Sequence, residues 1–183
     1  MPNLPTQKLT LAALLLAMGL LLPTVTGNIP QIGNALLPMH LPVLLTGLIC
    51  GWKYGLIVGA VTPLLRSLIF GAPPLFPIAT AMAFELATYG LVIGLVYLSL
   101  KNKNILSVYV ALVAAMIVGR VVWGLAMMSL LGMNNMPFSM QAFMAGALIN
   151  AVPGIVLQLV LIPVIIEVLT RASFFPLSPK GVR

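Results

Sequence analysis

Six long stretches of apolar residues constrain the fold of this sequence more than any other feature. They cover approximately residues 9–25, 35–51, 54–70, 78–100, 105–131 and 141–169 of the 183-residue chain. An α-helix needs about 20 apolar residues to cross the hydrocarbon core of a bilayer. The sequence therefore predicts an all-α, polytopic membrane protein. We expect a six-transmembrane-helix bundle that forms a single transmembrane domain over residues 1–183, with a short cytoplasmic tail at about 173–183.

The composition excludes other classes of protein. Hydrophobic residues make up 61% of the chain and charged residues 6%, whereas a soluble domain is about 25% charged. This excludes a soluble enzyme, a disordered chain and a nucleic-acid-binding module. The net charge of +7 does not indicate nucleic acid, because positive charge in membrane proteins collects on the cytoplasmic side. Cys50 is the one cysteine, so no intrachain disulfide can form.

The distribution of basic residues predicts the orientation of the chain. With the N-terminus in the cytoplasm, seven basic residues fall on the inner side: Lys8, Lys53, Lys101, Lys103, Arg171, Lys180 and Arg183. The three outer connections, at residues 27–34, 71–77 and 132–140, contain no charged residue. This asymmetry follows the positive-inside rule. We therefore expect both termini in the cytoplasm and an even number of spans.

Three charged residues lie well within the predicted spans, namely Arg66, Glu85 and Arg120, and Glu167 lies near the inner end of the sixth. A charge at the centre of a bilayer costs about 2.5–3.5 kcal/mol on insertion scales, so such residues are functional candidates. The orientation places all three in the outer half of the membrane, where His40 and Asn150 also fall. Polar groups from five spans would thus converge. This convergence predicts a solute pocket that opens to the outside.

The charge of this pocket indicates the kind of ligand. Two arginines and one glutamate sum to about +1 if all three face the pocket. A carboxylate ligand held by a guanidinium would balance the excess. Structural roles are open as well. Arg120 and Glu85 could form an internal pair that joins helices, and Arg66 could extend to the outer interface.

The remaining polar and aromatic candidates also have two interpretations each. His40 is either a packed histidine or a ligand contact, and Asn150 joins helices or contacts substrate. Trp123 follows Arg120 by three residues, on nearly the same helical face, and either stacks on a ligand or packs in the core. Tyr89 lies one turn after Glu85, where it could orient the carboxylate.

Motifs for catalysis and metal binding are missing. The sequence has no H-E-x-x-H, no G-x-S-x-G and no Walker A motif, and one histidine with one cysteine cannot build a zinc site. We therefore expect no catalytic residues, no metal and no cofactor, and a chain that is not an enzyme. Energy for active transport would have to come from another subunit or from an ion gradient.

Small residues four apart in the first span, Ala13 and Ala17, form a flat stripe that another helix can approach closely. Four further stretches accompany this A-x-x-x-A motif: PMHLP at 38–42, KYG at 53–55, TPLLRS at 62–67 and AFELATYG at 83–90. With its length, six spans and cytoplasmic termini, the chain resembles the substrate-binding S components of energy-coupling factor (ECF) vitamin transporters. The resemblance covers essentially the whole chain.

The resemblance implies a binding subunit of an ATP-driven, ABC-type importer in the bacterial plasma membrane. Such a subunit binds one water-soluble vitamin and associates with a membrane-embedded T component and two cytoplasmic ATPases. The A-x-x-x-A face, here Ala13 and Ala17, would contact the T component. The pocket would be built by the outer parts of spans four to six, with residues 27–34 as a gating loop.

The substrate remains open between two classes. The arginine pair favours a carboxylated vitamin such as pantothenate or niacin, and a neutral pyridoxine- or hydroxymethylpyrimidine-type compound is the rival. Two other functions are also open. A standalone secondary carrier or channel would transport without ATP, and an intramembrane enzyme would lose turnover when His40 or Glu85 is replaced.

Overall fold

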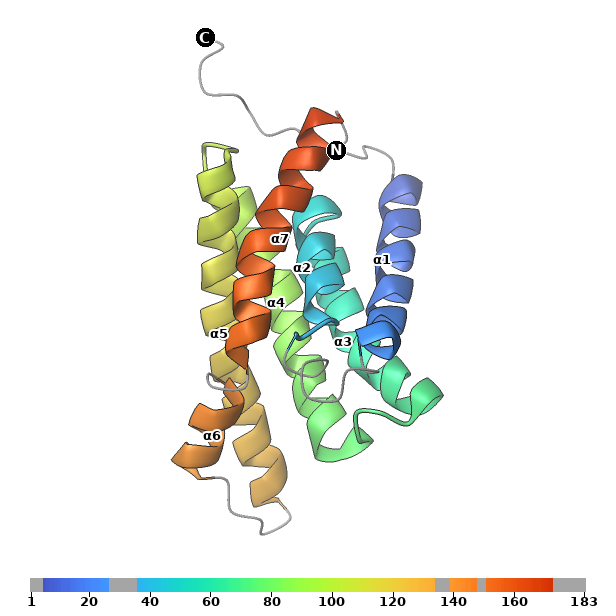
Figure 1. The fold of residues 1–183 in the computed structure, drawn as a ribbon, viewed down its shortest axis with the longest axis vertical. Helices are drawn as coiled ribbons and strands as arrows, with labels where there is room; N and C mark the ends of the chain where they lie inside the picture. The colour runs from blue at the N-terminus through green and yellow to red at the C-terminus, as the bar shows by residue number, and fades with distance from the viewer. Residues whose placement is uncertain (1–4, 27–35, 134–138, 148–150, 173–183) are drawn as a thin grey trace.

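A computed structural model describes residues 5–26, 36–133, 139–147 and 151–172. The described residues form helices and no strands (Figure 1). The helices are α1 (Pro5–Thr26), α2 (His40–Ile49), α3 (Trp52–Phe70), α4 (Thr80–Ser99), α5 (Ile105–Gly132), α6 (Met140–Ala147) and α7 (Val152–Arg171), with a kinked turn η1 (Leu75–Ala79) before α4. Within these described ranges, five helical segments are long and apolar enough to cross a membrane, and α2 is shorter. The predicted all-α fold is confirmed.

The chain ends of the described structure lie together. Helix α1 begins and α7 ends at the same end of the bundle, the upper end in Figure 1. The α2–α3 and α4–α5 connections lie there too. Five of the basic residues therefore gather at this end: Lys8, Lys53, Lys101, Lys103 and Arg171. Lys180 and Arg183 lie outside the described residues. We call this the basic end of the bundle.

Helix α2 is shorter than the predicted span 35–51, because residues on both sides stop it. Pro38 disfavours helical geometry in Leu37, which has φ 50°. Gly51 has φ 100°, which turns the chain into α3. At 1.5 Å per residue, α2 covers about half of a bilayer core. Every residue of α2 except Leu41 is buried, so its ends are enclosed by protein, as a broken membrane helix requires.

Helix α4 is the centre of the bundle and packs against α2, α3 and α5. Glycines allow this close approach. A methyl group added at Gly90 would lie 2.1 Å from the carbonyl oxygen of Gly55, and one added at Gly55 would lie 2.5 Å from that of Gly90. The backbones of α3 and α4 therefore touch, as small residues permit in membrane proteins. This packing fixes Glu85 of α4 relative to the neighbouring helices.

The outer face of α1 carries the small-residue stripe. Ala12, Leu15 and Gly19 are buried against the bundle, where α1 packs on α2 and α3. Ala13 and Ala17 are exposed on the other side of the helix. The stripe thus faces outward from the described bundle.

The predicted sixth span, residues 141–169, is wrong as one continuous helix. Residues 140–147 form the short helix α6, and a separate helix, α7, begins at Val152. Pro153 lies in the first turn of α7. Proline lacks an N–H group and its ring clashes with the preceding turn, so a helix cannot run through this position without a kink or break. Helix α7 packs against α5 and α2.

Candidate functional site

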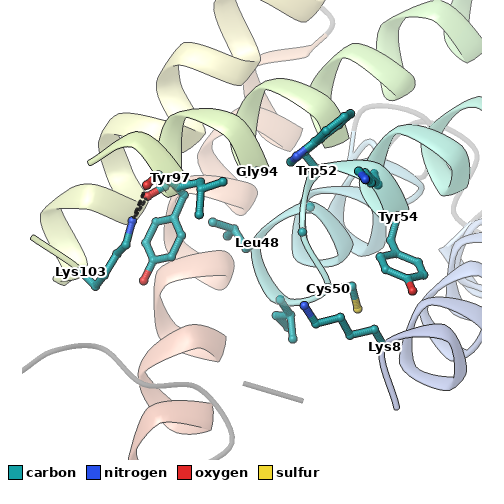
Figure 2. A pocket seen from close by; sticks show the side chains of 13 residues that line it. Lys8, Leu48, Cys50, Trp52, Tyr54, Gly94, Tyr97 and Lys103 are labelled. Carbon is teal, nitrogen blue, oxygen red and sulfur yellow. Dashed lines mark hydrogen bonds between the residues drawn. The ribbon is translucent and has the colours of Figure 1, made fainter. Parts of the chain in front are cut away.

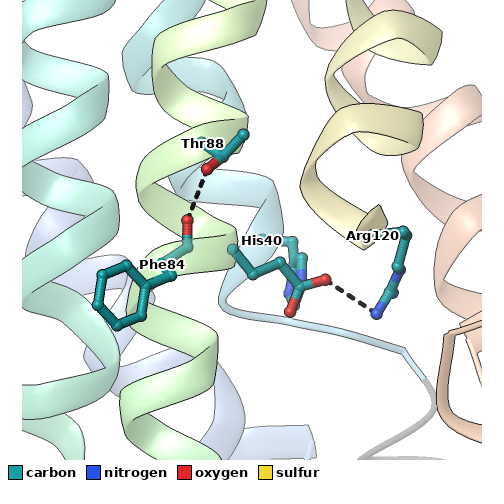
Figure 3. A network of polar contacts seen from close by, with 5 residues as sticks. His40, Phe84, Thr88 and Arg120 are labelled. Carbon is teal, nitrogen blue, oxygen red and sulfur yellow. Dashed lines mark hydrogen bonds and ion pairs between the residues drawn. The ribbon is translucent and has the colours of Figure 1, made fainter. Parts of the chain in front are cut away.

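Three ionisable side chains from three helices meet inside the bundle. The Arg120 guanidinium of α5 places Nη1 2.9 Å from Oε1 of Glu85 on α4. His40, at the start of α2, places Nε2 3.6 Å from the same oxygen (Figure 3). The side chains of His40 and Glu85 are 1% and 2% exposed, and that of Arg120 is 11% exposed. The predicted convergence of these three residues is therefore present in the structure.

Several nitrogen atoms in this cluster have no hydrogen-bond partner in the part of the chain that the structure describes. Among the described residues, no hydrogen-bond acceptor serves Arg120 Nε or Nη2, and neither ring nitrogen of His40 is hydrogen-bonded. Buried polar atoms are nearly always hydrogen-bonded, because leaving one unpaired costs about 1–3 kcal/mol. Unpaired donors beside a cavity are groups that a polar ligand can satisfy.

A cavity of about 190 Å³ adjoins the cluster, on the α5 and α6 side. Its lining includes Glu85, Arg120 and His40, together with Trp123 of α5 and Gly146 of α6. Trp123 also packs against α6, with its ring 6.3 Å from that of Phe143 at an interplanar angle of 28°. Trp123 therefore lines the cavity and also packs against α6, and stacking on a ligand stays a prediction.

A larger cavity of about 550 Å³ lies on the other side of His40, towards α1 and α3. Arg66 lines it, as do the prolines and methionines of the surrounding segments: Pro23, Pro38, Pro73, Pro74, Met39 and Met82. The two cavities share His40 and three apolar residues, Leu37, Ile78 and Met82. The space beside Arg66 and the space beside Arg120 therefore adjoin, and His40 lines both.

Contacts with Leu20 and Phe70 hold Arg66 in place. Its Nη1 donates a hydrogen bond of 2.5 Å to the carbonyl oxygen of Leu20 in α1. Its guanidinium carbon lies 5.0 Å from the centre of the Phe70 ring, one turn further along α3, within the range of a cation–π interaction. These contacts orient the guanidinium at the wall of the larger cavity and also join α3 to α1.

The charges of the site divide between the two cavities. The chain contains two acidic residues, Glu85 and Glu167. Glu85 pairs with Arg120, and Glu167 pairs with Arg171 at 2.7 Å, at the basic end. Among the described residues, no carboxylate lies within ion-pair distance of Arg66. The excess charge of about +1 that the sequence predicts is therefore located at Arg66, in the larger cavity.

Tyr89 packs against His40, one member of the cluster. It is 1% exposed, and its ring centre lies 5.2 Å from that of His40 at an angle of 60°. Gly119 makes room for it, because a methyl group there would lie 2.3 Å from Cε1 of Tyr89. Tyr89 is not among the described residues that line either cavity. Its place is thus beside the ionisable groups, in contact with the His40 ring.

Two predicted features lie outside the described residues, namely Asn150 and the segment 27–34. Two further residues were missed by the sequence analysis. Met82 lines both cavities one turn before Glu85, a spacing that the sequence displays. Gln158 of α7 is 2% exposed, and its Nε2 has no hydrogen-bond partner among the described residues. A polar residue in an apolar helix was the available signal for Gln158.

Comparison with known proteins identifies the class of this membrane protein. A family model for the substrate-specific component of ECF transporters matches residues 7–166. The chain therefore belongs to this family of transport subunits. Membership implies association with ECF T and ATPase components and a small-molecule substrate. Neither a curated protein nor a solved structure matches the chain.

Proposed function

We propose that this chain binds a carboxylated, water-soluble vitamin, such as pantothenate or niacin, on the side of the bacterial plasma membrane opposite its basic end. A membrane-embedded T component and two cytoplasmic ATPases then drive its import. The observation that carries the substrate class is the unpaired charge of Arg66 beside the larger cavity. A buried cation without a counter-charge is costly, and an anionic ligand removes that cost.

The position of Arg66 supports this proposal further. An arginine can bind a carboxylate through two parallel hydrogen bonds. Its guanidinium offers five N–H donors, of which one is used by the Leu20 carbonyl. The apolar remainder of the cavity wall, including Leu37, Ile78 and Met82, suits the carbon skeleton or ring of a small vitamin.

The His40–Glu85–Arg120 cluster has a different part in the proposal. Glu85 already neutralises Arg120, so this group of side chains offers directed hydrogen bonds rather than net charge. The unpaired nitrogens of His40 and Arg120 would bind hydroxyl, amide or ring-nitrogen atoms of the substrate. Trp123, beside them, offers an aromatic face.

The first test identifies the ligand directly. The chain is purified in detergent and denatured, and released small molecules are identified by mass spectrometry. The ligand-free chain is then titrated with pantothenate, niacin and pyridoxine. We expect one of the two carboxylated vitamins to bind most tightly. Tightest binding of pyridoxine would contradict the assigned substrate class, and binding of none would contradict a vitamin pocket of this kind.

A second test addresses transport. The chain is reconstituted in proteoliposomes with and without its T component and ATPases, and uptake of the bound vitamin is followed. We expect uptake only with the complete complex and ATP. Uptake by the chain alone, dependent on an ion gradient, would instead favour the secondary carrier that the sequence left open.

A further inference from the structure

A third cavity, of about 270 Å³, lies at the basic end of the bundle (Figure 2). It is formed where the start of α1, the α2–α3 corner and the end of α4 meet, and none of Arg66, Glu85 and Arg120 lines it. Lys8, Lys53 and Lys103 all line it. The two carboxylates of the chain are absent from its lining, since Glu85 pairs with Arg120 and Glu167 with Arg171.

The three lysines differ in what they bind within the chain. Lys103 donates hydrogen bonds to the carbonyl oxygens of Tyr97, Leu98 and Leu100, so it caps the end of α4. Lys53 lies 5.6 Å from the centre of the Trp52 ring. Neither Lys8 nor Lys53 forms an ion pair or hydrogen bond with another described residue. Two ammonium groups thus remain available to an external anion.

The rest of the lining is apolar and aromatic, and it reaches the outside of the bundle. Leu98 is 66% exposed and Lys53 is exposed as well, so the cavity borders the surface. Trp52 and Tyr54 stand at the same level as the lysines, and such aromatic residues concentrate at the membrane–water interface. The lysines could bind an anionic headgroup, and the exposed apolar side chain of Leu98 could contact an acyl chain. The cavity thus matches the two parts of a lipid molecule.

We infer that this cavity binds the headgroup of an anionic phospholipid, with Lys8 and Lys53 as the phosphate-binding residues and Leu98 against the start of an acyl chain. Basic pockets between membrane helices on the cytoplasmic side bind such headgroups. The site is separate from the vitamin site and does not depend on the vitamin proposal. It would anchor the α1 and α2–α3 ends of the bundle to the inner leaflet.

Trp52 provides a local probe of this site. The chain has two tryptophans, so Trp123→Phe leaves Trp52 as the sole emitter. The protein is reconstituted in nanodiscs that contain brominated phosphatidylglycerol or brominated phosphatidylcholine at equal mole fractions, in a background of unbrominated phosphatidylcholine. We expect brominated phosphatidylglycerol to quench Trp52 at a mole fraction about tenfold or more below that needed for brominated phosphatidylcholine. Equal quenching by the two lipids would overturn the inference.

The lysine variants separate a defined site from general charge attraction. Lys8→Gln with Lys53→Gln is expected to abolish the preference for phosphatidylglycerol, whereas Lys8→Arg with Lys53→Arg keeps it. Lys101→Gln is the matched control, because Lys101 is an exposed lysine at the same end that does not line the cavity. An equal loss of preference in Lys101→Gln would show general attraction and would overturn the site. Circular dichroism verifies that each variant is folded.

A last experiment tests whether the ligand of this cavity is a lipid or a free anion. Inorganic phosphate is added to nanodiscs that contain brominated phosphatidylglycerol, and we expect quenching to remain. Loss of quenching at a low phosphate concentration would show a site for the free anion and would contradict a lipid site. The same comparison is made after the T component and ATPases are added. Release of quenching on assembly, with no lipid preference in the full complex, would assign the cavity to a partner protein instead.

Discussion

Arg120 and Glu85 form an ion pair between α5 and α4, with Nη1 2.9 Å from Oε1 and the carboxylate almost fully buried. Removal of one partner leaves the other charge without compensation in a low-dielectric interior. We expect Arg120→Met to lower the free energy of unfolding of the ligand-free chain by about 3–5 kcal/mol. Thermal and denaturant unfolding of the detergent-purified chain measure this change.

The double variant provides the control for this prediction. In Arg120→Met with Glu85→Gln no charge is left unpaired, so most of the lost stability is expected to return. If the single and double variants were equally unstable, the loss would come from packing around Arg120, and the ion pair would contribute little.

Contact between the backbones of α3 and α4 leads to a second prediction. Gly90→Ala places a methyl group 2.1 Å from the Gly55 carbonyl oxygen, and backbone cannot yield as a flexible side chain can. We expect a loss of about 1–3 kcal/mol in stability, as for an overpacked core. Gly132→Ala is the matched control, since nothing lies within 4 Å of its added methyl group. Equal melting temperatures for the two variants would contradict the close approach.

The outward face of α1 gives a third prediction. Ala13 and Ala17 are exposed, whereas Ala12 on the same helix is buried. If this stripe is the contact with the T component, Ala13→Trp and Ala17→Trp should leave vitamin binding intact and abolish co-purification with the T component and ATPases. Ile117→Trp, at a residue of α5 that is also exposed, is the control. Normal assembly of both alanine variants would place the interface elsewhere.

Cys50 gives a prediction on pH dependence. It lies in the α2–α3 connection and is 2% exposed. Burial raises the pKa of its thiol to about 11, and the positive charge of Lys8 opposes part of that increase. Because the thiolate is the reactive form, we expect slow maleimide labelling at neutral pH that accelerates as the pH rises towards the pKa. Lys8→Gln removes the opposing charge, so it should raise the pKa and slow labelling further.

An engineered exposed thiol is the reference for this measurement. Lys101→Cys in a Cys50→Ala background places a thiol on an exposed connection at the same end. It should react at least about tenfold faster at neutral pH, as expected for a thiol of ordinary pKa. Comparable rates for the two thiols would contradict the burial of Cys50.

The sequence predicted the membrane class and the polar residues of the interior, because hydropathy and isolated charges are local properties. It also predicted that Glu85 and Arg120 come together, but left open whether they bind each other or a ligand. Whether Arg66 and Arg120 line the same cavity depends on the distances between helices, and these cannot be predicted from residue spacing in the sequence. In the structure the two arginines line different cavities, which adjoin and share His40 among their lining residues.

Helix boundaries were predicted less well where the chain departs from regular spans. Continuous hydropathy across 141–169 concealed the break before α7, although Pro153 was a visible signal for it. The shortness of α2 depends on Leu37 and Gly51, whose positive φ angles terminate the helix. Gln158 was missed since its burial depends on how α7 packs on its neighbours.

The most direct measurement of the central claim compares each carboxylated vitamin with a neutral analogue: niacin with nicotinamide, and pantothenate with pantothenol. Affinities are measured for the unaltered chain, for Arg66→Gln, and for Arg171→Gln as a control at the basic end. We predict that the unaltered chain and Arg171→Gln prefer the acid of one pair. Arg66→Gln should weaken the binding of that acid by about 10–100-fold, which is the contribution of a charged hydrogen bond. The affinity for its neutral analogue should stay nearly unchanged. An unchanged ratio of acid to neutral affinity in Arg66→Gln would contradict the account.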